Sequence, residues 1–473
     1  MTPVTDSAEA LAAQRAVEAE LVGRWPETKL DPSTERVVAL MDVLGQPQRA
    51  YPVIHITGTN GKTSTARMIE SLLGALRLRT GRYTSPHVES MTERISLDGE
   101  PISAERFVET YRDIQPYIDI VDAAQQHRLS FFEVITAMAY AAFADAPVDV
   151  AVVEVGMGGT WDATNVVDGT VAVVTPIAVD HANRLGSTPG EIAVEKAGII
   201  KKDSLVVLAR QPADAAESLL RRAVEVDATV AREGMEFGVV RRDLAVGGQL
   251  LTLRGLAGEY EDVFLPLHGM HQAENAAVAL AAVEAFLGVG TADRPGLTGA
   301  GALDADLVRE AFASVTSPGR LEVVRRSPTV LIDAAHNPAG ALATARAMTD
   351  SFDFRHLVGV VAVMADKDVR GVLEALEPVL AEVVVTQNSQ PRAMPVDELA
   401  ALAVEVFGAD RVDVQPALPD AIEAAVTLAE EEGDLGGAGV LITGSVVTVG
   451  EARVLLKGGG REAGTGRTDG RDA

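Results

Sequence analysis

The amino-acid sequence predicts an α/β protein with an N-terminal P-loop domain, whose sheet is mostly parallel, and a smaller, Rossmann-like C-terminal α/β domain. Three observations lead to this prediction. Residues 51–65 read as a strand, a glycine-containing loop and the start of a helix. The β-branched run at 148–155 is typical of a strand buried on both faces of a parallel sheet. Strands and helices alternate again after the Pro-Gly turn at 317–320, which places the domain boundary there.

The first two predicted elements are helices. Residues 7–24 have the apolar spacing of an amphipathic helix. A second helix is expected to begin at Asp31, with Asp31 as its N-cap and Pro32 in its first turn. Both helices precede the strand, loop and helix that carry the clearest motif.

That motif consists of a mostly apolar strand at 53–56, a loop, and a helix that includes residues 66–78. Gly58 and Gly61 in the loop allow positive φ and a close approach of the backbone. Successive N–H groups can then bind an anion at the N-terminus of the helix. The alternative is a glycine-rich turn that binds no nucleotide.

The side chains after these glycines are those of a phosphate loop. Lys62 would neutralise phosphate charge, and Thr63 or Ser64 would ligate Mg²⁺. The usual P-loop has its first glycine where Ile56 stands, so the match is partial. The segment 57–63 resembles the shorter variant of ATP-dependent amide ligases of the Mur type. We therefore predict a P-loop ATPase domain.

Two candidate polar groups lie between residues 80 and 143. A strand at 80–84 ends in Ser85, whose hydroxyl can lie beside the phosphate loop, although Ser-Pro turns are also common without a function. Helices are expected at 103–122 and 129–143, and the second is apolar enough for burial. Glu133 in this second helix needs a partner, either as a helix cap or in contact with a substrate.

Glu154 lies near the end of the predicted strand 148–155 and precedes the glycines at 156–159. The carboxyl ends of strands are where open α/β sheets bind ligands. A carboxylate at this edge, beside a phosphate loop, would bind Mg²⁺ or position a water molecule. The alternative is a salt-bridged glutamate at a strand end.

His181 follows a similar strand at 170–179. The residues alone leave open whether His181 binds a metal, because Mg²⁺ prefers oxygen ligands. Lys196 lies on a predicted helix at 191–198, where its neighbours suggest a surface ion-pair partner.

The remaining elements complete two domains. The first contains a strand at 204–209, β-rich turns at 230–265, a helix from His268 and a glycine-rich connector at 288–301. The second alternates strands at 329–332, 356–363, 382–386, 411–414 and 440–443 with helices at 339–350, 369–380, 395–406 and 418–431. The predicted domains are residues 1–316 and 317–456, followed by a disordered tail at 457–473 that is rich in Gly, Arg and Asp.

The composition limits the classes of function. The chain has 473 residues, 47% of them hydrophobic, which fits a globular protein of two or three domains. Its formal net charge of −27 argues against sequence-independent nucleic-acid binding, but a local basic pocket can still hold a polyanionic substrate. The absence of cysteine excludes disulfides, catalytic thiolates and zinc-thiolate sites. The chain has no secretory signal and no membrane span, so we expect a cytoplasmic protein.

Eight short motifs occur in the order known from one family. They are the segments 57–63, 84–87, 154–165, 180–181, 195–199, 318–320, 333–338 and 366–368. In this order they resemble the folylpolyglutamate synthase/dihydrofolate synthase family, of the bacterial bifunctional type within the Mur ligase superfamily. The resemblance extends from about residue 25 to residue 455.

The resemblance implies ATP and two Mg²⁺ ions as cofactors, with K⁺ as a further candidate. The implied ATP-binding residues are Gly58, Thr59, Asn60, Gly61, Lys62, Thr63, Ser64, Asn275, Arg320 and Asp333. Arg320 would reach across the hinge. The implied metal ligands are Ser85, Glu154, His181 and Lys196, with Lys196 carbamylated so that it offers a bridging carboxylate to a second metal.

The resemblance also implies substrate-binding and catalytic residues. The substrate-binding residues are Asp31, Pro32, Ser33, Ser130, Phe131, Phe132, Glu133, Trp161, Asp162 and Ala163 for the pterin, and Ser445 near the glutamate. The catalytic residues are Lys62, Lys196, His336 and Arg94. The family pattern has Arg-Leu where this chain has Thr160 and Trp161, a difference that concerns the pterin pocket rather than the metals.

The implied function is the ATP-dependent addition of L-glutamate to dihydropteroate, to the γ-carboxylate of reduced folates, or to both, through an acyl phosphate. The C-terminal domain would deliver the glutamate, and we expect a monomer that binds neither nucleic acid nor membranes. The alternative is a Mur-type ligase that acts on another carboxylate. A GTPase switch would need an Asn-Lys-x-Asp motif, and no asparagine here is followed by lysine. A phosphotransferase would leave the second domain unexplained.

Overall fold

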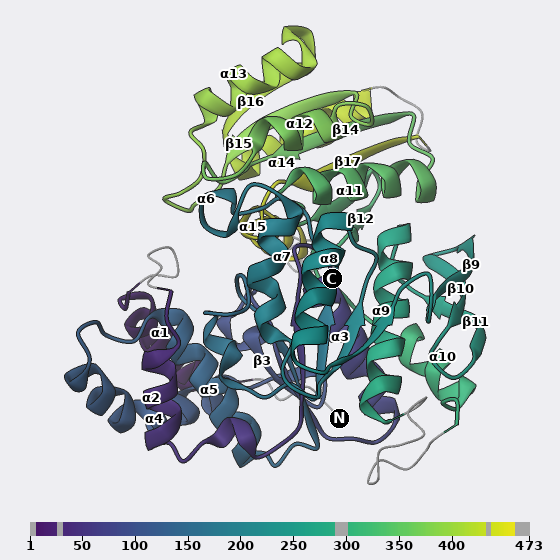
Figure 1. Cartoon of the computed structure of the whole chain (residues 1–473). Coiled ribbons are helices and arrows are strands. Elements are labelled where there is room, and N and C mark those ends of the chain that lie inside the picture. The colour runs from purple at the N-terminus through teal and green to yellow at the C-terminus, as the bar shows by residue number, and fades with distance from the viewer. Residues whose placement is uncertain (1–5, 26–31, 289–300, 432–436, 459–473) are drawn as a thin grey trace, which may run out of the picture. The chain divides into compact units, whose positions relative to one another are not determined.

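The computed structural model describes residues 6–25, 32–288, 301–431 and 437–458. The chain divides into two compact units (Figure 1). The first comprises residues 1–266 and 270–316, and the second comprises residues 267–269 and 317–473. Each unit is built around its own large β-sheet.

The first unit contains an eight-stranded sheet in the order β4-β3-β2-β5-β1-β6-β7-β8. Its strands are β1 Val53–Thr57, β2 Thr80–Tyr83, β3 Ile95–Leu97, β4 Glu100–Pro101, β5 Val150–Glu154, β6 Val171–Val174, β7 Leu205–Leu208 and β8 Thr229–Arg232. From β2 to β8 the strands run parallel, whereas β3 and β4 add an antiparallel edge. The central strands are buried along their whole length, as the β-branched runs predict.

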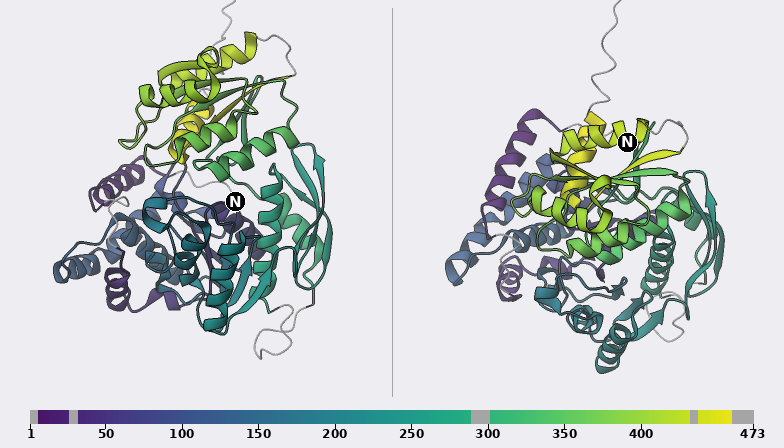
Figure 2. Two further views of the ribbon diagram at one scale, coloured as in Figure 1. Left: turned by 45° about the horizontal axis from the view of Figure 1, so that its top comes forward. Right: turned by 90° about the horizontal axis from the view of Figure 1, so that it is seen from above.

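Helices cover both faces of this sheet (Figure 2). The helices of this unit are α1 Ala8–Val22, α2 Glu35–Val43, α3 Lys62–Ala75, α4 Ala104–Ala124, α5 Phe131–Asp145, α6 Ala182–Leu185, α7 Pro189–Lys196, α8 Ala213–Glu225, α9 Met270–Phe286 and α10 Ala305–Ala313. Short 3₁₀ helices are η1 Pro47–Arg49, η2 Met91–Arg94, η3 Ala163–Val166 and η4 Ala197–Ile199. The helices α4, α5, α7 and α8 share apolar cores with one face, and α3 and α9 pack on the other.

A three-stranded antiparallel sheet completes the first unit. Its order is β11-β10-β9, and its strands are β9 Gly238–Ala245, β10 Gly248–Arg254 and β11 Glu259–Leu265. It packs against α9 and α10. These strands form the region for which the sequence predicts β-rich turns.

The second unit contains a six-stranded sheet in the order β12-β13-β17-β14-β15-β16. Its strands are β12 Glu322–Arg326, β13 Thr329–Asp333, β14 His356–Val361, β15 Glu382–Gln387, β16 Val412–Ala417 and β17 Ala438–Thr443, and only β12 is antiparallel to its neighbour. Its helices are α11 Pro338–Ser351, α12 Val369–Leu376, α13 Val396–Phe407, α14 Leu418–Glu431 and α15 Val446–Gly458, and its 3₁₀ helix is η5 Ala409–Arg411. The predicted α/β class, with mostly parallel sheets in both parts, is confirmed.

The observed elements differ from the predicted ones in a few places. The second helix begins at Glu35, whose amide donates to Ser33 Oγ at 3.1 Å, and Pro32 precedes it. Asp31, the expected cap, lies outside the described residues, as do parts of the connector and the tail at 289–300 and 459–473. The strands β3, β4 and β12 and the helices α8, α10 and α15 were not predicted individually, because these segments are short or carry charged residues between the apolar ones.

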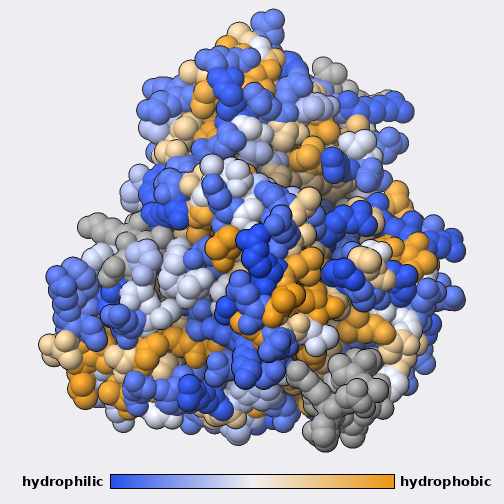
Figure 3. Space-filling model, in the orientation of Figure 1, coloured by the Kyte–Doolittle hydropathy of each residue, from blue (hydrophilic) through white to orange (hydrophobic). Residues whose placement is uncertain are grey.

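On the face shown in Figure 3, hydrophilic residues predominate and apolar residues occur in scattered groups between them. Among the residues that the structure describes, no helix is long and apolar enough to cross a membrane.

Candidate active site

The predicted site residues of the first unit lie at the carboxyl edge of its parallel sheet. The strands β2, β5, β1 and β6 are adjacent in this order, so their carboxyl ends share one edge. Ser85 follows β2, Glu154 ends β5, the loop 58–61 follows β1, and His181 lies after β6. The topology therefore brings the four predicted segments to the edge where open α/β sheets bind ligands.

The two glycines of the phosphate loop are required by its geometry. Gly58 has a φ of 144° and Gly61 has a φ of 89°, a region that favours glycine. A Cβ atom on Gly58 would lie 1.9 Å from Thr175 Oγ1, and one on Gly61 would lie 2.5 Å from Asn275 Oδ1. Any side chain at these positions would therefore displace the neighbouring backbone or polar groups.

Hydrogen bonds fix the phosphate loop to the segment that follows β6. The Thr59 amide donates to the carbonyl oxygen of Pro176 at 3.0 Å, and the Thr59 hydroxyl donates to that of Ala178 at 2.9 Å. Lys62 Nζ lies 3.2 Å from the carbonyl oxygens of both Gly58 and Thr59. The Lys62 ammonium thus stays at the loop, at the N-terminus of α3, where an anion would be stabilised.

The structure distinguishes the two hydroxyls that follow Lys62. Thr63 Oγ1 lies 3.0 Å from both carboxylate oxygens of Glu154, which is only 1% exposed. Ser64 is buried and accepts a hydrogen bond from Gln272 Nε2 at 3.3 Å, so its hydroxyl faces α9. Thr63 is therefore the hydroxyl placed beside the predicted metal-binding carboxylate.

The entrance of α9 supports the phosphate loop from the other side. Asn275, a predicted ATP contact, packs against Gly61 and donates from Nδ2 to Gln272 Oε1 at 3.2 Å. Gln272 connects Asn275 to Ser64 and was not predicted as a site residue. The only signal for it in the sequence was the cluster of polar side chains at the start of this helix.

Lys196 is buried, so the interpretation of this residue as a surface ion-pair partner is wrong. It is 4% exposed, and Nζ donates to the carbonyl oxygen of Gly58 at 2.8 Å. Burial, and then the positive charge of Lys62, lower the pKa of Lys196 to about 7. In a substantial fraction of the molecules, the Lys196 side chain is therefore an uncharged amine near neutral pH.

Asp180 and His181 directly precede α6, and His181 is the N-cap of this helix. His181 has a φ of 52°, an unusual backbone conformation for a residue with a side chain. Its Nε2 lies 4.0 Å from Asp180 Oδ2, and its side chain is 29% exposed. Among the described residues, no three His, Cys, Asp or Glu side chains cluster closely enough to hold a metal by themselves. The predicted set includes only two residues of these types, together with a serine and a modified lysine.

The loop after β2 carries two more predicted residues, Ser85 and Arg94. Arg94 is buried, and its Nε donates to His87 Nδ1 at 3.0 Å. Its guanidinium lies 4.9 Å from the centre of the Phe131 ring. The Thr84 amide donates to the Arg94 carbonyl oxygen at 3.0 Å and so joins the two ends of this loop.

The predicted pterin-binding segment at 130–133 forms the N-terminus of α5. Ser130 and Glu133 make a capping box, and Glu133 also pairs with Arg36 Nε at 3.1 Å. Of the two roles considered for Glu133, the structure shows the capping role. Phe131 is buried, and the ring of Phe132 packs where a Cβ atom on Gly156 would lie.

The second predicted pterin-binding segment, 161–163, follows the glycine loop after β5. Asp162 caps η3 and accepts hydrogen bonds from the amides of Thr164 and Met157, each at 2.9 Å. Burial raises its pKa. The Trp161 amide donates to Glu195 Oε1 at 3.2 Å, and Ala163 is the first residue of η3. The polar groups of this segment mainly stabilise its own turn.

In the second unit, Asp333 ends β13 and holds the turn that carries Arg320. Asp333 Oδ2 accepts from the Leu321 amide at 3.0 Å, while Oδ1 accepts from the Ala335 amide at 3.0 Å and from Thr344 Oγ1 at 2.7 Å. Both oxygens of this predicted ATP contact thus stabilise backbone turns.

His336 and Ser445 lie at the same carboxyl edge, because β13 and β17 are parallel neighbours. His336 Nδ1 lies 3.0 Å from the Ala334 carbonyl oxygen. Ser445 is buried, and its Oγ accepts from the Thr448 amide at 3.0 Å and from Asn388 Nδ2 at 3.2 Å. The prediction that these residues lie near a glutamate stays a prediction.

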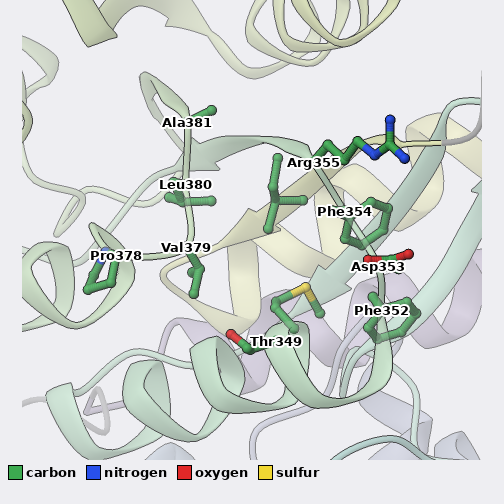
Figure 4. A pocket seen from close by; sticks show the side chains of 11 residues that line it. Thr349, Phe352, Asp353, Phe354, Arg355, Pro378, Val379, Leu380 and Ala381 are labelled. Atoms are coloured by element: carbon green, nitrogen blue, oxygen red, sulfur yellow. The ribbon is translucent and has the colours of Figure 1, made fainter. Parts of the chain in front are cut away.

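A pocket of about 430 Å³ lies elsewhere in the second unit (Figure 4). Its lining includes Phe352, Phe354 and Leu380, which precede the strands β14 and β15. The pocket is therefore at the amino edge of the sheet, whereas Asp333 and Ser445 lie at the carboxyl edge. It takes no part in the predicted glutamate site.

Both units match known protein families. Residues 56–283 match the Mur ligase middle domain, and residues 319–446 match the Mur ligase, glutamate ligase domain. Together with the phosphate loop at the sheet edge, these matches place the chain in the Mur class of ligases.

The relatives define the family more narrowly. The chain is 54% identical to a dihydrofolate synthase/folylpolyglutamate synthase of Mycobacterium tuberculosis, over 96% of each chain, and 32% identical to that of Bacillus subtilis, over 90% of this chain and 95% of the relative. It therefore belongs to the dihydrofolate synthase/folylpolyglutamate synthase family.

Solved structures agree with this assignment. The Mycobacterium tuberculosis folylpolyglutamate synthase complexed with ADP has a TM-score of 0.89 at 53% identity and covers 98% of this chain and 100% of its own. An Escherichia coli protein in complex with DHPP and ADP has a TM-score of 0.81 at 29% identity, over 95% of this chain and 99% of its own.

Proposed function

We propose that this chain is an ATP-dependent ligase that adds L-glutamate to dihydropteroate and to the γ-carboxylate of reduced folates. The observation that carries the proposal is the phosphate loop at the sheet edge. Beside this loop, Thr63 Oγ1 lies 3.0 Å from both carboxylate oxygens of Glu154. Membership of the family supports the same function, because the relative that is 54% identical bears both activities in its name.

The proposed reaction has two steps. A carboxylate is a poor electrophile, so an oxygen of the substrate carboxylate first attacks the γ-phosphorus of ATP, which yields an acyl phosphate and ADP. The deprotonated α-amine of glutamate then attacks the carbonyl carbon; the C–N bond forms, the C–O bond breaks, and inorganic phosphate leaves. Lys62 at the loop offsets the repulsion between the two anions and stabilises the transferring phosphoryl group.

The residues at the sheet edge fit magnesium. The hydroxyls of Ser85 and Thr63 and the buried carboxylate of Glu154 are the oxygen donors that Mg²⁺ prefers, whereas His181 would be a less usual ligand. We propose that Ser85, Glu154 and His181 hold one ion and that Lys196, as a carbamate, contributes to a second. Bound Mg²⁺ would neutralise phosphate charge during transfer. Potassium is a further candidate cofactor. Replacing K⁺ by Na⁺ in the ligase assay tests whether it is needed.

The burial of Lys196 beside the loop supports its proposed carbamylation. The uncharged amine adds to CO₂, which gives a carbamate and releases one proton. We expect ¹³C-labelled bicarbonate to produce a carbamate resonance in the wild-type chain that is absent from Lys196→Met. The exposed Lys202 offers a matched control, because Lys202→Met should keep the resonance. The same signal in Lys196→Met would contradict the modification at this position.

The second unit is proposed to bind glutamate at its carboxyl edge through His336 and Ser445. Its matched family model is the glutamate ligase domain, and both residues lie beside the buried ends of β13 and β17. Arg320 and Asp333 are proposed to contact the nucleotide, and Arg94 the acyl phosphate. We propose that the chain acts as a monomer. Measuring its molar mass by light scattering during gel filtration tests this proposal.

The ligase assay separates this function from its alternatives. ADP release is measured with dihydropteroate, tetrahydrofolate or a muramyl nucleotide, each with and without L-glutamate. We expect release with the first two substrates only when glutamate is present. Release that depends on the muramyl nucleotide would favour a Mur-type ligase acting on another carboxylate. Release without glutamate would overturn the ligase proposal.

A further inference from the structure

A fully buried arginine, Arg82, lies on β2 beneath the candidate active site. Its exposed fraction is 0%, and its Nε donates to Glu70 Oε2 at 2.6 Å. Its other two nitrogens donate to hydroxyls, Nη1 to Thr84 Oγ1 at 3.1 Å and Nη2 to Ser96 Oγ at 2.7 Å. None of these four residues has a role in the function proposed above.

The partners of Arg82 come from three different segments. Glu70 lies on α3, the helix that begins at the phosphate loop. Thr84 directly precedes Ser85, the proposed metal ligand, and Ser96 lies on β3, where the sheet resumes after the loop. One guanidinium therefore joins the phosphate-loop helix to the first residue of the loop 84–94 and to β3, the strand that directly follows this loop.

The loop between these ends is also ordered from within. The carboxylate of Glu93 accepts from three successive amides, those of Val88 at 2.9 Å, Glu89 at 3.0 Å and Ser90 at 2.9 Å. The loop thus has a defined shape of its own, and its placement against α3 depends on its two ends. Arg82 contacts Thr84 at the start of the loop and Ser96 in the strand that directly follows its end.

Stability alone does not explain a charged pair at this place. Removing two charges from water is costly, and a well-packed apolar pair of similar volume is often equally stable or more stable. Moreover, Glu70 Oε1 is buried without a hydrogen-bond partner among the described residues, which adds to the cost. What the pair provides is geometry, because the planar guanidinium presents its donors in fixed directions.

We propose that Arg82, held by Glu70, is a positioning residue that sets Ser85 relative to the phosphate loop and so tunes the affinity for the metal ion. This inference rests on the proposed function, in which Ser85 is a ligand of Mg²⁺. Residues that orient metal ligands typically change metal affinity by 10- to 100-fold when they are replaced. Loss of one contact at the start of the loop should therefore weaken metal binding about tenfold.

The test removes single hydroxyls rather than the buried charges, because a variant of Arg82 or Glu70 risks misfolding. Thr84→Val and Ser96→Ala each break one bond to Arg82 and leave the ion pair intact. Thr386→Val is the matched control, since Thr386 is equally buried and its hydroxyl has no hydrogen-bond partner among the described residues. All variants are examined as full-length chains.

Three measurements are made on each variant. Mn²⁺ binding is followed by electron paramagnetic resonance in the presence of a non-hydrolysable ATP analogue, the Mg²⁺ concentration for half-maximal ADP release is determined, and amide hydrogen exchange is measured for residues 87–94. For Thr84→Val we expect Mn²⁺ to bind about tenfold more weakly, Mg²⁺ half-saturation to rise by a similar factor, and exchange in the loop to accelerate. Ser96→Ala should shift the same quantities in the same direction, and Thr386→Val should shift none.

The outcomes distinguish a failure of the positioning role of Arg82 from a failure of the proposed ligase function. Wild-type affinity for Mn²⁺ and wild-type Mg²⁺ dependence in both loop variants would overturn the inference, even if their melting temperatures fall. A wild-type chain that binds Mn²⁺ but releases no ADP would overturn the proposed function. In that case the Mn²⁺ affinities of the variants still decide the inference.

Discussion

At the scale of single residues, His55 lies at the end of a buried hydrogen-bonded chain in the first unit. Thr164 Oγ1 donates to Asp162 Oδ1 at 2.5 Å, so it accepts from His55 Nε2 at 3.0 Å. His55 Nδ1 has no hydrogen-bond partner among the described residues. Protonation would place an additional N–H group at this unpartnered position, which explains why the imidazole stays neutral.

This environment predicts a dependence of stability on pH. Burial, and then the positive charge of Lys201, lower the pKa of His55 to about 3. The unfolded chain, with an ordinary histidine pKa near 6.5, then binds more protons than the folded chain between these two values. The free energy of unfolding should therefore fall as the pH falls below about 6.5, by at most about 1.4 kcal/mol per pH unit from this residue.

Denaturant unfolding between pH 7 and pH 5 measures this effect. His55→Gln should show a shallower decrease over this range, because glutamine does not titrate. His127 is exposed, so His127→Gln should keep the wild-type decrease. Equal slopes for wild type and His55→Gln would show that His55 does not carry this pH dependence.

At the scale of elements, the N-terminus of α5 shows how a predicted binding segment can be structural. The Glu133 amide donates to Ser130 Oγ at 3.2 Å, and Glu133 Oε2 accepts from the Ser130 amide at 2.7 Å. Ser130→Ala should lower the free energy of unfolding by about 1 kcal/mol, like other losses of an N-cap. Glu133→Gln should cost more, about 3 kcal/mol, because it leaves the largely buried Arg36 without its ionic partner.

The same variants decide between the two roles considered for Glu133. A capping role predicts lower stability and an unchanged KM for the pterin substrate, whereas substrate contact predicts a raised KM with little change in stability. Ser103→Ala is the control, because Ser103 caps α4 through the Arg106 amide at 3.1 Å and belongs to no predicted site.

At the scale of the whole molecule, the sequence was sufficient for the fold class and for the sheet edge where the candidate site lies. The strand and loop at 53–61 are defined by local patterns, and adjacent parallel strands bring Ser85 and Glu154 to one edge. The partners of individual polar groups were not predictable in this way. The sequence neighbours of Lys196 suggest a surface residue, and only the folded structure shows that it is buried. The hydrogen bond from Gln272 to Ser64 joins α9 and α3, which are far apart in the sequence.

Nucleotide binding links the candidate site to the stability of the unit that contains it. A ligand that binds only the folded state, at 100 times its dissociation constant, adds about 2.7 kcal/mol to the free energy of unfolding. A non-hydrolysable ATP analogue with Mg²⁺ should therefore raise the unfolding midpoint of the wild-type chain. Because the Lys62 ammonium lies at the loop, Lys62→Ala should unfold like the wild type without nucleotide, show little increase with it, and lose ligase turnover.

The exposed Lys202 again provides the control, since Lys202→Ala should keep both the increase and the turnover. Retained turnover in Lys62→Ala would place the phosphoryl-transfer site elsewhere than the loop between β1 and α3.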